Sequence, residues 1–394
     1  MWKWNATPEE KEDYRELMRK KVEELSCPHE ECEDYGEKGK GNIVFVRKYG
    51  TGETQNLFKC KTCGKTFSER KGTPLFGFIL NEEKILDIIM CLVEGNGIRK
   101  TARIQRVNKD TVTRILNAFG EHMKAVYEYF MHDYRMEECQ FDELWTFIKK
   151  KESNLSELEK LIAEFGDMWV GIGFDPINKV IASLVVGKRN EELIDKLVGG
   201  VKKVTDNNIP LFTSDGLRWY EKKILEHYGI QEKTVRTGKR GRPMKPKKTP
   251  HPDLKYAQVV KQYKKGKVAK VDFKVVFGNE EEVKKLIEKS PVSKHINTSF
   301  VERNNLTLRE NNGRLSRKTL SFSKETERLV NQLWLFMGYY HFVRLHGGIA
   351  IGVETENGRK QWTKRTPFMA AGITNNVWTL RELVTFRIPP KMNT

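Results

Sequence analysis

The stretch "IPLFTSDGLRWYEKKILEHYG", residues 209–229, sets the fold class of the chain. A short apolar run ends at Ser214 and Asp215, and the pattern that follows is typical of a helix. A buried strand that leads directly into a helix is a building unit of α/β domains. In such sheets ligands bind outside the carboxyl ends of the strands, which is where Asp215 stands.

Further strands and helices surround this unit. Strand-like runs begin at residue 138 with "ECQFDELWTFI" and continue with "DMWVGIGFD" and "KVIASLVVG". The last two flank the turn signal "PIN" and read as a hairpin. A helical pattern, "NEELIDKLVGGVKKV", precedes the opening stretch, and residues 279–345 are mostly helical in pattern after a strand-like "KVAKVDFKVVFG". The order of elements predicts an α/β domain with a mixed sheet.

Three carboxylates stand at informative places in this order. Asp142 lies in the strand "QFDELW", Asp215 ends the strand "LFTSDG", and Glu302 opens a helix in "SFVERNN". Oxygen ligands suit hard cations, so these acids could converge to hold two Mg²⁺ ions. Other readings stay open: Ser299 and Glu302 fit a capping box, and Asp215 precedes a glycine and could serve a turn. Glu143, beside Asp142, would point to the other face of the strand.

Composition restricts the partner. The 394 residues suggest two or three domains, and 71 Lys and Arg against 53 Asp and Glu give a net charge of +18. This balance points to a polyanion such as DNA, RNA or an anionic membrane surface. The longest uncharged apolar stretch, residues 329–343, is too short to span a bilayer and contains Asn, Gln and His. With no apolar signal region at its start, we expect a cytoplasmic protein that uses neither a membrane nor a small-molecule substrate.

Four of the six cysteines form two pairs. Cys27 and Cys32 frame "CPHEEC", and Cys60 and Cys63 frame "CKTC", which is followed by a glycine. A Cys-x2-Cys turn ending in Gly presents two thiolates to one tetrahedral ion, so we expect one structural zinc in a ribbon of short strands. His29 could replace one cysteine as a ligand. Four unrelated buried thiols are the alternative.

Residues 82–118 have the pattern of two or three short helices around Gly-rich turns, which is typical of a helix-turn-helix. The recognition helix would begin near Lys109, capped by Asn108, with Val112, Ile115, Leu116 and Phe119 buried. Asn117 lies off that stripe and could meet DNA. The candidate DNA contacts here are Arg99, Lys100, Arg103, Arg106, Lys109, Thr111, Thr113 and Arg114. An ordinary helical connector is the alternative.

A basic segment interrupts the α/β pattern at residues 231–256. Its core, "KRGRP" at 239–243, resembles an AT-hook, in which Arg240 and Arg242 would lie in a narrow A·T minor groove. The segment could equally be a solvated basic linker without base preference.

Taken together, these segments resemble the IS1 family of insertion-sequence transposases, of the longer single-reading-frame kind. The similarity rests on "CKTCGKTFSERKGTP", "QFDELW", "LFTSDG", "KYAQVV", "INTSFVERNNLTLR", "RKTLSFSKE" and "RTPFMAAGITNNVWTL", and it spans residues 27–380. It implies an RNase H-like domain whose catalytic triad is Asp142, Asp215 and Glu302, with DNA as the partner. Arg303, Asn304, Asn305 and Arg309 would then face DNA or brace the acid. The chain departs from the family pattern in "YYHFVRLHGG", where His341 and Leu345 stand, which weakens a role for His346.

We therefore expect a multidomain α+β protein that binds the inverted terminal repeats of its element, frees 3′-hydroxyl ends with two Mg²⁺ or Mn²⁺ ions per site, and joins them to target DNA. It would act in the prokaryotic nucleoid as a homo-oligomer, at least a dimer. The expected parts are an N-terminal helix (1–26), a zinc ribbon (27–72), a helix-turn-helix (80–122), an RNase H-like domain (135–348) with a basic insertion at about 231–278, and a closing segment (349–394). The rival hypotheses are a DNA-binding regulator with an inactive large domain, and a nuclease that cuts without joining.

Overall fold

The computed structural model describes residues 7–50, 55–162, 164–205, 208–232, 247–264, 267–354 and 359–389. It divides into two compact units, and each is described by itself. The first unit contains residues 1–89 and 380–394, and the second contains residues 90–379. The chain is a mixed α+β protein with a mixed sheet, as the sequence predicts. Among the helices that the structure describes, none is both long enough and apolar enough to cross a bilayer.

The first unit is built on a three-stranded antiparallel sheet in the order β1-β2-β3. Met18 of helix α1 is buried in its core with Phe58 and Phe67, and Val22 packs against the same cluster. The first helix therefore packs on the cysteine module. The elements are α1 (Pro8–Glu23), β1 (Ile43–Tyr49), β2 (Gln55–Cys60), β3 (Thr66–Ser68) and α12 (Leu380–Thr385), with α2 (Glu82–Val93) crossing the boundary between the units.

The second unit contains a six-stranded sheet in the order β11-β10-β7-β4-β5-β6. Strand β7 pairs in parallel with β4 and β10, whereas the other neighbours are antiparallel, and β5 and β6 form the predicted hairpin. The strands are β4 (Glu138–Ile148), β5 (Gly166–Phe174), β6 (Ile181–Gly187), β7 (Leu211–Asp215), β10 (Lys255–Lys264) and β11 (Lys267–Phe277). This arrangement is consistent with an RNase H-like fold.

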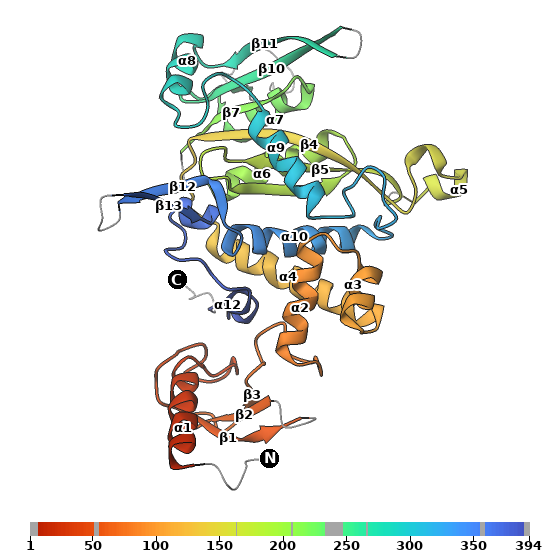
Figure 1. Ribbon diagram of the computed structural model, residues 1–394. Coiled ribbons are helices and arrows are strands. Elements are labelled where there is room, and N and C mark those ends of the chain that lie inside the picture. The colour runs from red at the N-terminus through yellow and green to blue at the C-terminus, as the bar shows by residue number, and fades with distance from the viewer. Residues whose placement is uncertain are drawn as a thin grey trace, which may run out of the picture. The chain divides into compact units, whose positions relative to one another are not determined.

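Helices cover both faces of this sheet (Figure 1). A Cβ on Gly171 or Gly173 of β5 would meet side chains of α6. Ile172, which lies between these glycines, pairs with Asp142 of β4, and Asp142 contacts α9. Because side chains alternate along a strand, α6 and α9 cover opposite faces. The remaining helices of the unit are α3 (Ile98–Gln105), α4 (Lys109–Phe130), α5 (Glu157–Lys160), α6 (Glu191–Val204), α7 (Arg218–Tyr228), α8 (Glu280–Lys289), α9 (Ser299–Glu310), α10 (Thr326–Phe342) and α11 (Pro367–Ala370).

Helices α4 and α10 pack closely because glycines lie where they cross. A Cβ on Gly120 would stand 2.6 Å from the backbone oxygen of Asn331, and one on Gly338 would stand 2.5 Å from Sδ of Met123. The packing also fixes α4 to the sheet, since the hydroxyl of Tyr127 donates to the carbonyl oxygen of Ile181 on β6 at 2.9 Å.

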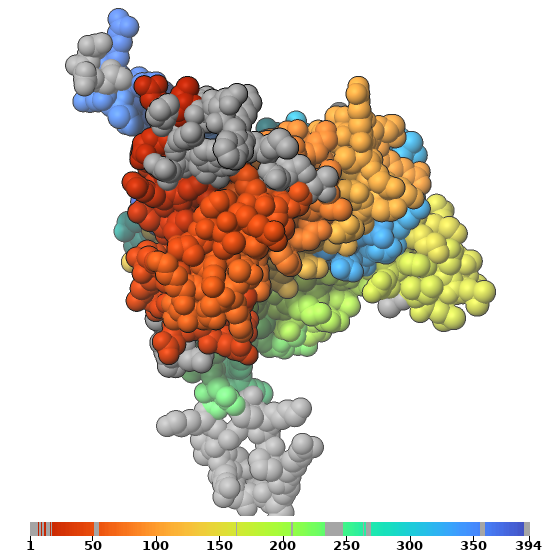
Figure 2. Space-filling view, turned by 90° about the horizontal axis from the view of Figure 1, so that it is seen from below, coloured from red at the N-terminus to blue at the C-terminus, as the bar shows by residue number. Residues whose placement is uncertain are grey.

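Two antiparallel ribbons complete the second unit. Strands β12 (His346–Glu354) and β13 (Lys360–Arg365) pair only with each other among the described residues and project from the rest of the unit (Figures 1 and 2). The short strands β8 (Ile230–Gln231) and β9 (Lys248–Thr249) pair with each other and lie on either side of the AT-hook-like stretch in the sequence. Residues 233–246, including Arg240 and Arg242, lie outside the described residues. Residues 255–277 of the expected basic insertion form β10 and β11, so this part of the segment belongs to the sheet.

Candidate active site and cysteine cluster

Asp142 lies on β4, in the middle of the sheet, with its side chain toward α9. Strand β4 runs parallel to β7, with Gln140 opposite Thr213, so Asp142 and Asp215 are each two residues further along neighbouring strands. The side-chain amide of Asn305 on α9 donates a 2.7 Å hydrogen bond to Oδ2 of Asp142. The next residue, Glu143, is buried on the opposite side, where it accepts hydrogen bonds from Tyr220 of α7 and from Arg189. The predicted alternation of these two acids is confirmed.

Asp215 ends β7 and is half exposed, with 47% of its side chain accessible. Its Oδ1 accepts a 3.0 Å hydrogen bond from the backbone N–H of Leu217, so it does serve the turn that the sequence suggests. Its Oδ2 lies 3.9 Å from Nη2 of Arg189, which also holds Glu143 at 2.9 Å. One oxygen therefore shapes the turn, and the other lies within reach of a cation.

Glu302 lies in the first turn of α9. The capping box with Ser299 is not formed, because the N-cap residue is Thr298 and the hydroxyl of Ser299 donates to Asn297 instead. Oε1 of Glu302 accepts a 2.8 Å hydrogen bond from the Thr298 hydroxyl and forms an ion pair with Lys261 of β10. Glu302 is thus held by side chains from a neighbouring strand and its own helix, at 44% exposure.

The three acids influence one another electrostatically. Burial, together with the negative charges of Glu143, Glu302 and Asp215, raises the pKa of Asp142 to about 7. Burial also raises the pKa of Glu143, against the hydrogen bonds from Tyr220 and Arg189. The neighbouring carboxylates disfavour the ionised form of Asp142, and a bound cation would stabilise that form.

The acids are neighbours but are not drawn together around one point. Among the described residues, the four cysteines are the group whose ligand atoms all lie within 4.8 Å of one another. The oxygens of Asp142, Asp215 and Glu302 are more widely spread. The three acids therefore do not form a group that would hold a single ion in the arrangement that the structure shows.

Sequence analysis missed two cations of this region, Lys261 and Arg189. Lys261 lies within β10, beyond the last residue of that strand that pairs with β7, and Arg189 comes two residues after β6. Each contacts a carboxylate that lies far away in the sequence. The alternation of "KYAQVVKQYK" carries a strand signal, but lysines at both ends conceal it and nothing local indicates Glu302 as the partner of Lys261.

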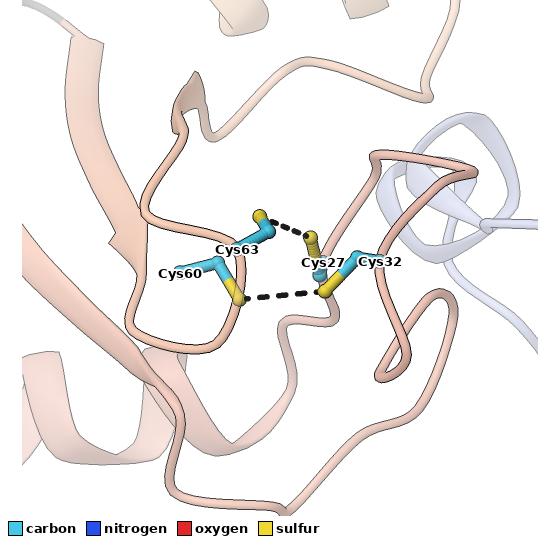
Figure 3. A group of neighbouring side chains, drawn as sticks. All are labelled: Cys27, Cys32, Cys60 and Cys63. Atoms are coloured by element: carbon cyan, nitrogen blue, oxygen red, sulfur yellow. Dashed lines mark hydrogen bonds between the residues drawn. The ribbon is translucent and has the colours of Figure 1, made fainter.

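In the first unit, the four cysteines converge as the sequence predicts (Figure 3). Sγ of Cys27 lies 3.7 Å from Sγ of Cys63, and Sγ of Cys32 lies 3.8 Å from Sγ of Cys60. All four thiols are free, and a tetrahedral zinc site with Zn–S bonds of about 2.3 Å has S–S edges of roughly 3.8 Å. The cluster therefore has the geometry to bind zinc. His29 is not a member of this group.

The local backbone explains why the sulfurs converge. Cys60 ends β2, and its backbone N–H donates to the carbonyl oxygen of Lys65 at 3.0 Å, which closes the turn to β3. Gly64 adopts φ +70 in that turn, a conformation that favours glycine. Cys27 and Cys32 are presented by a loop in which the backbone N–H of Cys32 donates to the carbonyl oxygen of His29 at 3.0 Å.

Helices α3 and α4 lie where the helix-turn-helix is expected. Asn108 caps α4 by accepting from the backbone N–H of Asp110 at 2.8 Å, and Val112, Ile115, Leu116 and Phe119 are buried, as predicted. Asn117 receives a hydrogen bond from Asn331 of α10 and therefore faces the helix pair rather than DNA. Of the candidate DNA contacts, Thr111 and Thr113 are half-buried, and the exposed ones are Arg99, Lys100, Arg103, Arg106, Lys109 and Arg114.

On α9, the polar residues around Glu302 have different surroundings. Arg303 is exposed, whereas Asn304 is buried at 5% exposure and is not placed to contact DNA. Arg309 is half-buried and donates to the carbonyl oxygen of Leu315 at 2.8 Å. Asn305 is the residue of this group that braces an acid, through its bond to Asp142.

A comparison with protein families finds one family model that matches part of this chain. The family model described as "IS1 transposase" matches residues 273–343, from the end of β11 to the end of α10, a segment that includes Glu302. The resemblance to IS1 transposases is confirmed. The match to this family supports a DNA transposase as the class of protein.

Other comparisons add little. A solved structure of the Mos1 transposase paired-end complex with the left transposon end matches at 11% identity and a TM-score of 0.15. The match covers 36% of this chain and 56% of the Mos1 chain, so this chain spans little more than half of that protein. A TM-score of 0.15 is too low to define fold or activity. No curated protein matches the chain.

Proposed function

We propose that this chain is a DNA transposase that binds the ends of its element, cleaves phosphodiester bonds to free 3′-hydroxyl groups, and joins those ends to target DNA. The observation that carries the proposal is the neighbourhood of Asp142, whose pKa is raised by burial and by the charges of Glu143, Glu302 and Asp215. These acids come from two parallel strands and a helix. The match of residues 273–343 to the IS1 transposases supports a catalytic role for these acids.

The residues fit divalent metal ions. All three candidate ligands are carboxylates, which suit Mg²⁺ or Mn²⁺, and one of them already pairs with the cation of Lys261. Two bound ions would supply activation of water or a 3′-hydroxyl and would stabilise the leaving oxygen. No protein nucleophile is required.

The chain's own side chains orient the acids. Asn305 fixes the carboxylate of Asp142 from α9, and Thr298 fixes that of Glu302. Arg189 lies 3.9 Å from Asp215, so it can hold that acid in place from the side of Glu143. These contacts keep the carboxylates ordered, as outer-shell partners do for metal ligands.

DNA binding is proposed for the cysteine module and for helices α3 and α4. One structural zinc ion held by Cys27, Cys32, Cys60 and Cys63 would stabilise the small first-unit sheet, which has little apolar material of its own. The exposed cations of α3 and α4 would contact phosphates, and α4 would serve as recognition helix. Two DNA ends must be held together during joining, so at least a dimer is proposed on DNA.

The test is strand transfer. Purified protein with DNA carrying the flanking sequences of its gene should release 3′-hydroxyl ends and form joined products with Mg²⁺ or Mn²⁺, whereas Asp215→Asn should do neither. Equal activity of this variant would remove Asp215 from the reaction. Cleavage without joined products would favour the nuclease, and binding without cleavage would favour the regulator.

A further inference from the structure

Strands β10 and β11 continue beyond the sheet beside the candidate active site. Strand β10 pairs with β7 only as far as Val259, opposite Asp215, and then continues with β11 alone to Lys264. We call residues 260–264 and 267–273 the β10–β11 ribbon. It begins where β7 ends, so it extends the surface that carries Asp215.

The two faces of this ribbon differ. On one face Val259 pairs with Phe273 and Lys261 pairs with Val271; on the other, Val260 pairs with Asp272 and Gln262 with Lys270. Paired residues of neighbouring strands point to the same side, so the face of Val259 is the face of Asp215. The ion pair of Lys261 with Glu302 agrees with this assignment.

The face toward the acids exposes apolar side chains. Val271 is 56% exposed and Phe273 is 44% exposed, and Nζ of Lys284 lies 5.7 Å from the centre of the Phe273 ring. A paired duplex presents mainly phosphates and groove edges at its surface, for which cations and polar groups suffice. An exposed aromatic side chain can stack on the face of a base that is unstacked from its neighbour, as the bases of a single strand are.

The positive charge of the ribbon favours a nucleic acid over an apolar protein surface as its partner. The ribbon and its base carry exposed or half-exposed lysines, and its acid, Asp272, lies on the opposite face, bound to Lys270 at 2.7 Å and to Gln262 at 3.0 Å. Lys261 lies on the face of Phe273, and Lys284 lies beside that ring, whereas Lys270 and Lys274 pair with Gln262 and Gln258 and lie on the other face. Apolar side chains among cations form the combination that binds single strands, through stacking and backbone charge.

We propose that the face of Lys261, Val271 and Phe273 binds unpaired nucleotides of the DNA next to the cleaved phosphate, with Phe273 stacked on a base. This rests on the proposed function and narrows its substrate to a DNA end that is locally unpaired.

The experiment is a binding measurement that does not require cleavage. Fluorescence anisotropy compares a labelled forked duplex bearing single-stranded arms with the same strands fully paired, both without divalent metal. Wild-type protein should bind the fork more tightly, and Phe273→Ala and Val271→Ser should each weaken fork binding by roughly tenfold, with duplex binding unchanged. Phe273→Tyr should retain fork binding, because it keeps the ring.

The matched control is Val260→Ser, which changes a valine on the opposite face that is 39% exposed. It should bind the fork as wild type does. Fork binding that is unchanged in Phe273→Ala, or lost equally in Val260→Ser, would overturn the inference, and thermal unfolding identifies a variant that has simply lost its fold. Absence of metal-dependent cleavage by wild type would contradict the proposed function, a separate result from the fork measurement.

Discussion

Asn305 and Asp142 are joined by a 2.7 Å hydrogen bond that ties α9 to a central strand of the sheet. Asn305 is 8% exposed, and its Oδ1 has no partner among the described residues. The bond fixes the direction of the most buried of the three acids and places α9, which carries Glu302, against β4. One amide therefore connects Asp142 to the helix that carries Glu302.

The first prediction concerns this amide. Asn305→Ala should lower the rate of DNA cleavage by roughly 10- to 100-fold and raise the Mg²⁺ concentration needed for half-maximal rate, because outer-shell partners of ligands have effects of this size. Single-turnover cleavage over a Mg²⁺ series measures both. Leu306→Ala, at an exposed neighbouring position, is the control and should behave as wild type. An unchanged Mg²⁺ dependence in Asn305→Ala would rule out its positioning role.

The second prediction concerns pH. The pKa of Asp142 is raised to about 7 in the folded state, above the value of about 3.9 in an unfolded chain. Between these values the folded state keeps a proton that the unfolded state has lost, so the resulting stabilisation disappears as the pH rises through 7. Wild type should therefore lose stability between about pH 4 and pH 7 in EDTA, and Asp142→Asn should lose less.

Urea unfolding at a series of pH values measures this difference. At pH 8 the free energy of unfolding of Asp142→Asn should exceed that of wild type by on the order of 1–3 kcal/mol. Glu143→Gln is a poor substitute, because it removes an acid that Arg189 and Tyr220 hold. Parallel pH profiles for wild type and Asp142→Asn would show that the pKa of Asp142 is not raised in the folded protein.

The third prediction concerns the cysteine cluster. Native protein should contain one zinc ion per chain by elemental analysis, and Cys60→Ser with Cys63→Ser should lose it and unfold the small sheet, since the cluster lies in that core. Cys91→Ser is the control: Cys91 is half-buried on α2, accepts a hydrogen bond from Gln105 and is not a member of the four-cysteine group. Native protein without zinc would refute the metal assignment.

The fourth prediction concerns the exposed cations of α3. Arg103→Ala should weaken binding to any DNA sequence about equally and reduce the slope of log affinity against log salt by roughly 1, as loss of one phosphate contact does. Lys124→Ala, an exposed cation further along α4, should leave the slope unchanged. If both variants give the wild-type slope, α3 does not lie on the DNA.

Much of the local structure could be predicted because its signals are local. The hairpin of β5 and β6 follows from two alternating runs around a turn, and the cap of α4 follows from Asn108 before an amphipathic pattern. The convergence of the four cysteines was predictable from the Cys-x2-Cys spacing and the glycine that follows it. Strand β10 was missed because lysines interrupt its apolar pattern, and it is a strand only because β7 and β11 pair with it.

The sequence by itself determined the kinds of element, the paired cysteines, the excess of positive charge and the identity of three acids. Tertiary structure alone decided that Glu302 is held by Lys261 and Thr298 instead of capping its helix, that Asn305 reaches Asp142 and Asn117 faces α10, and that Phe273 shares a face with the acids. The physical reason is range: propensity, capping and spacing act over a few residues. The partners of a charge or an amide, by contrast, are chosen by strand register and helix packing, between segments 41 residues apart for Lys261 and Glu302 and 163 residues apart for Asp142 and Asn305.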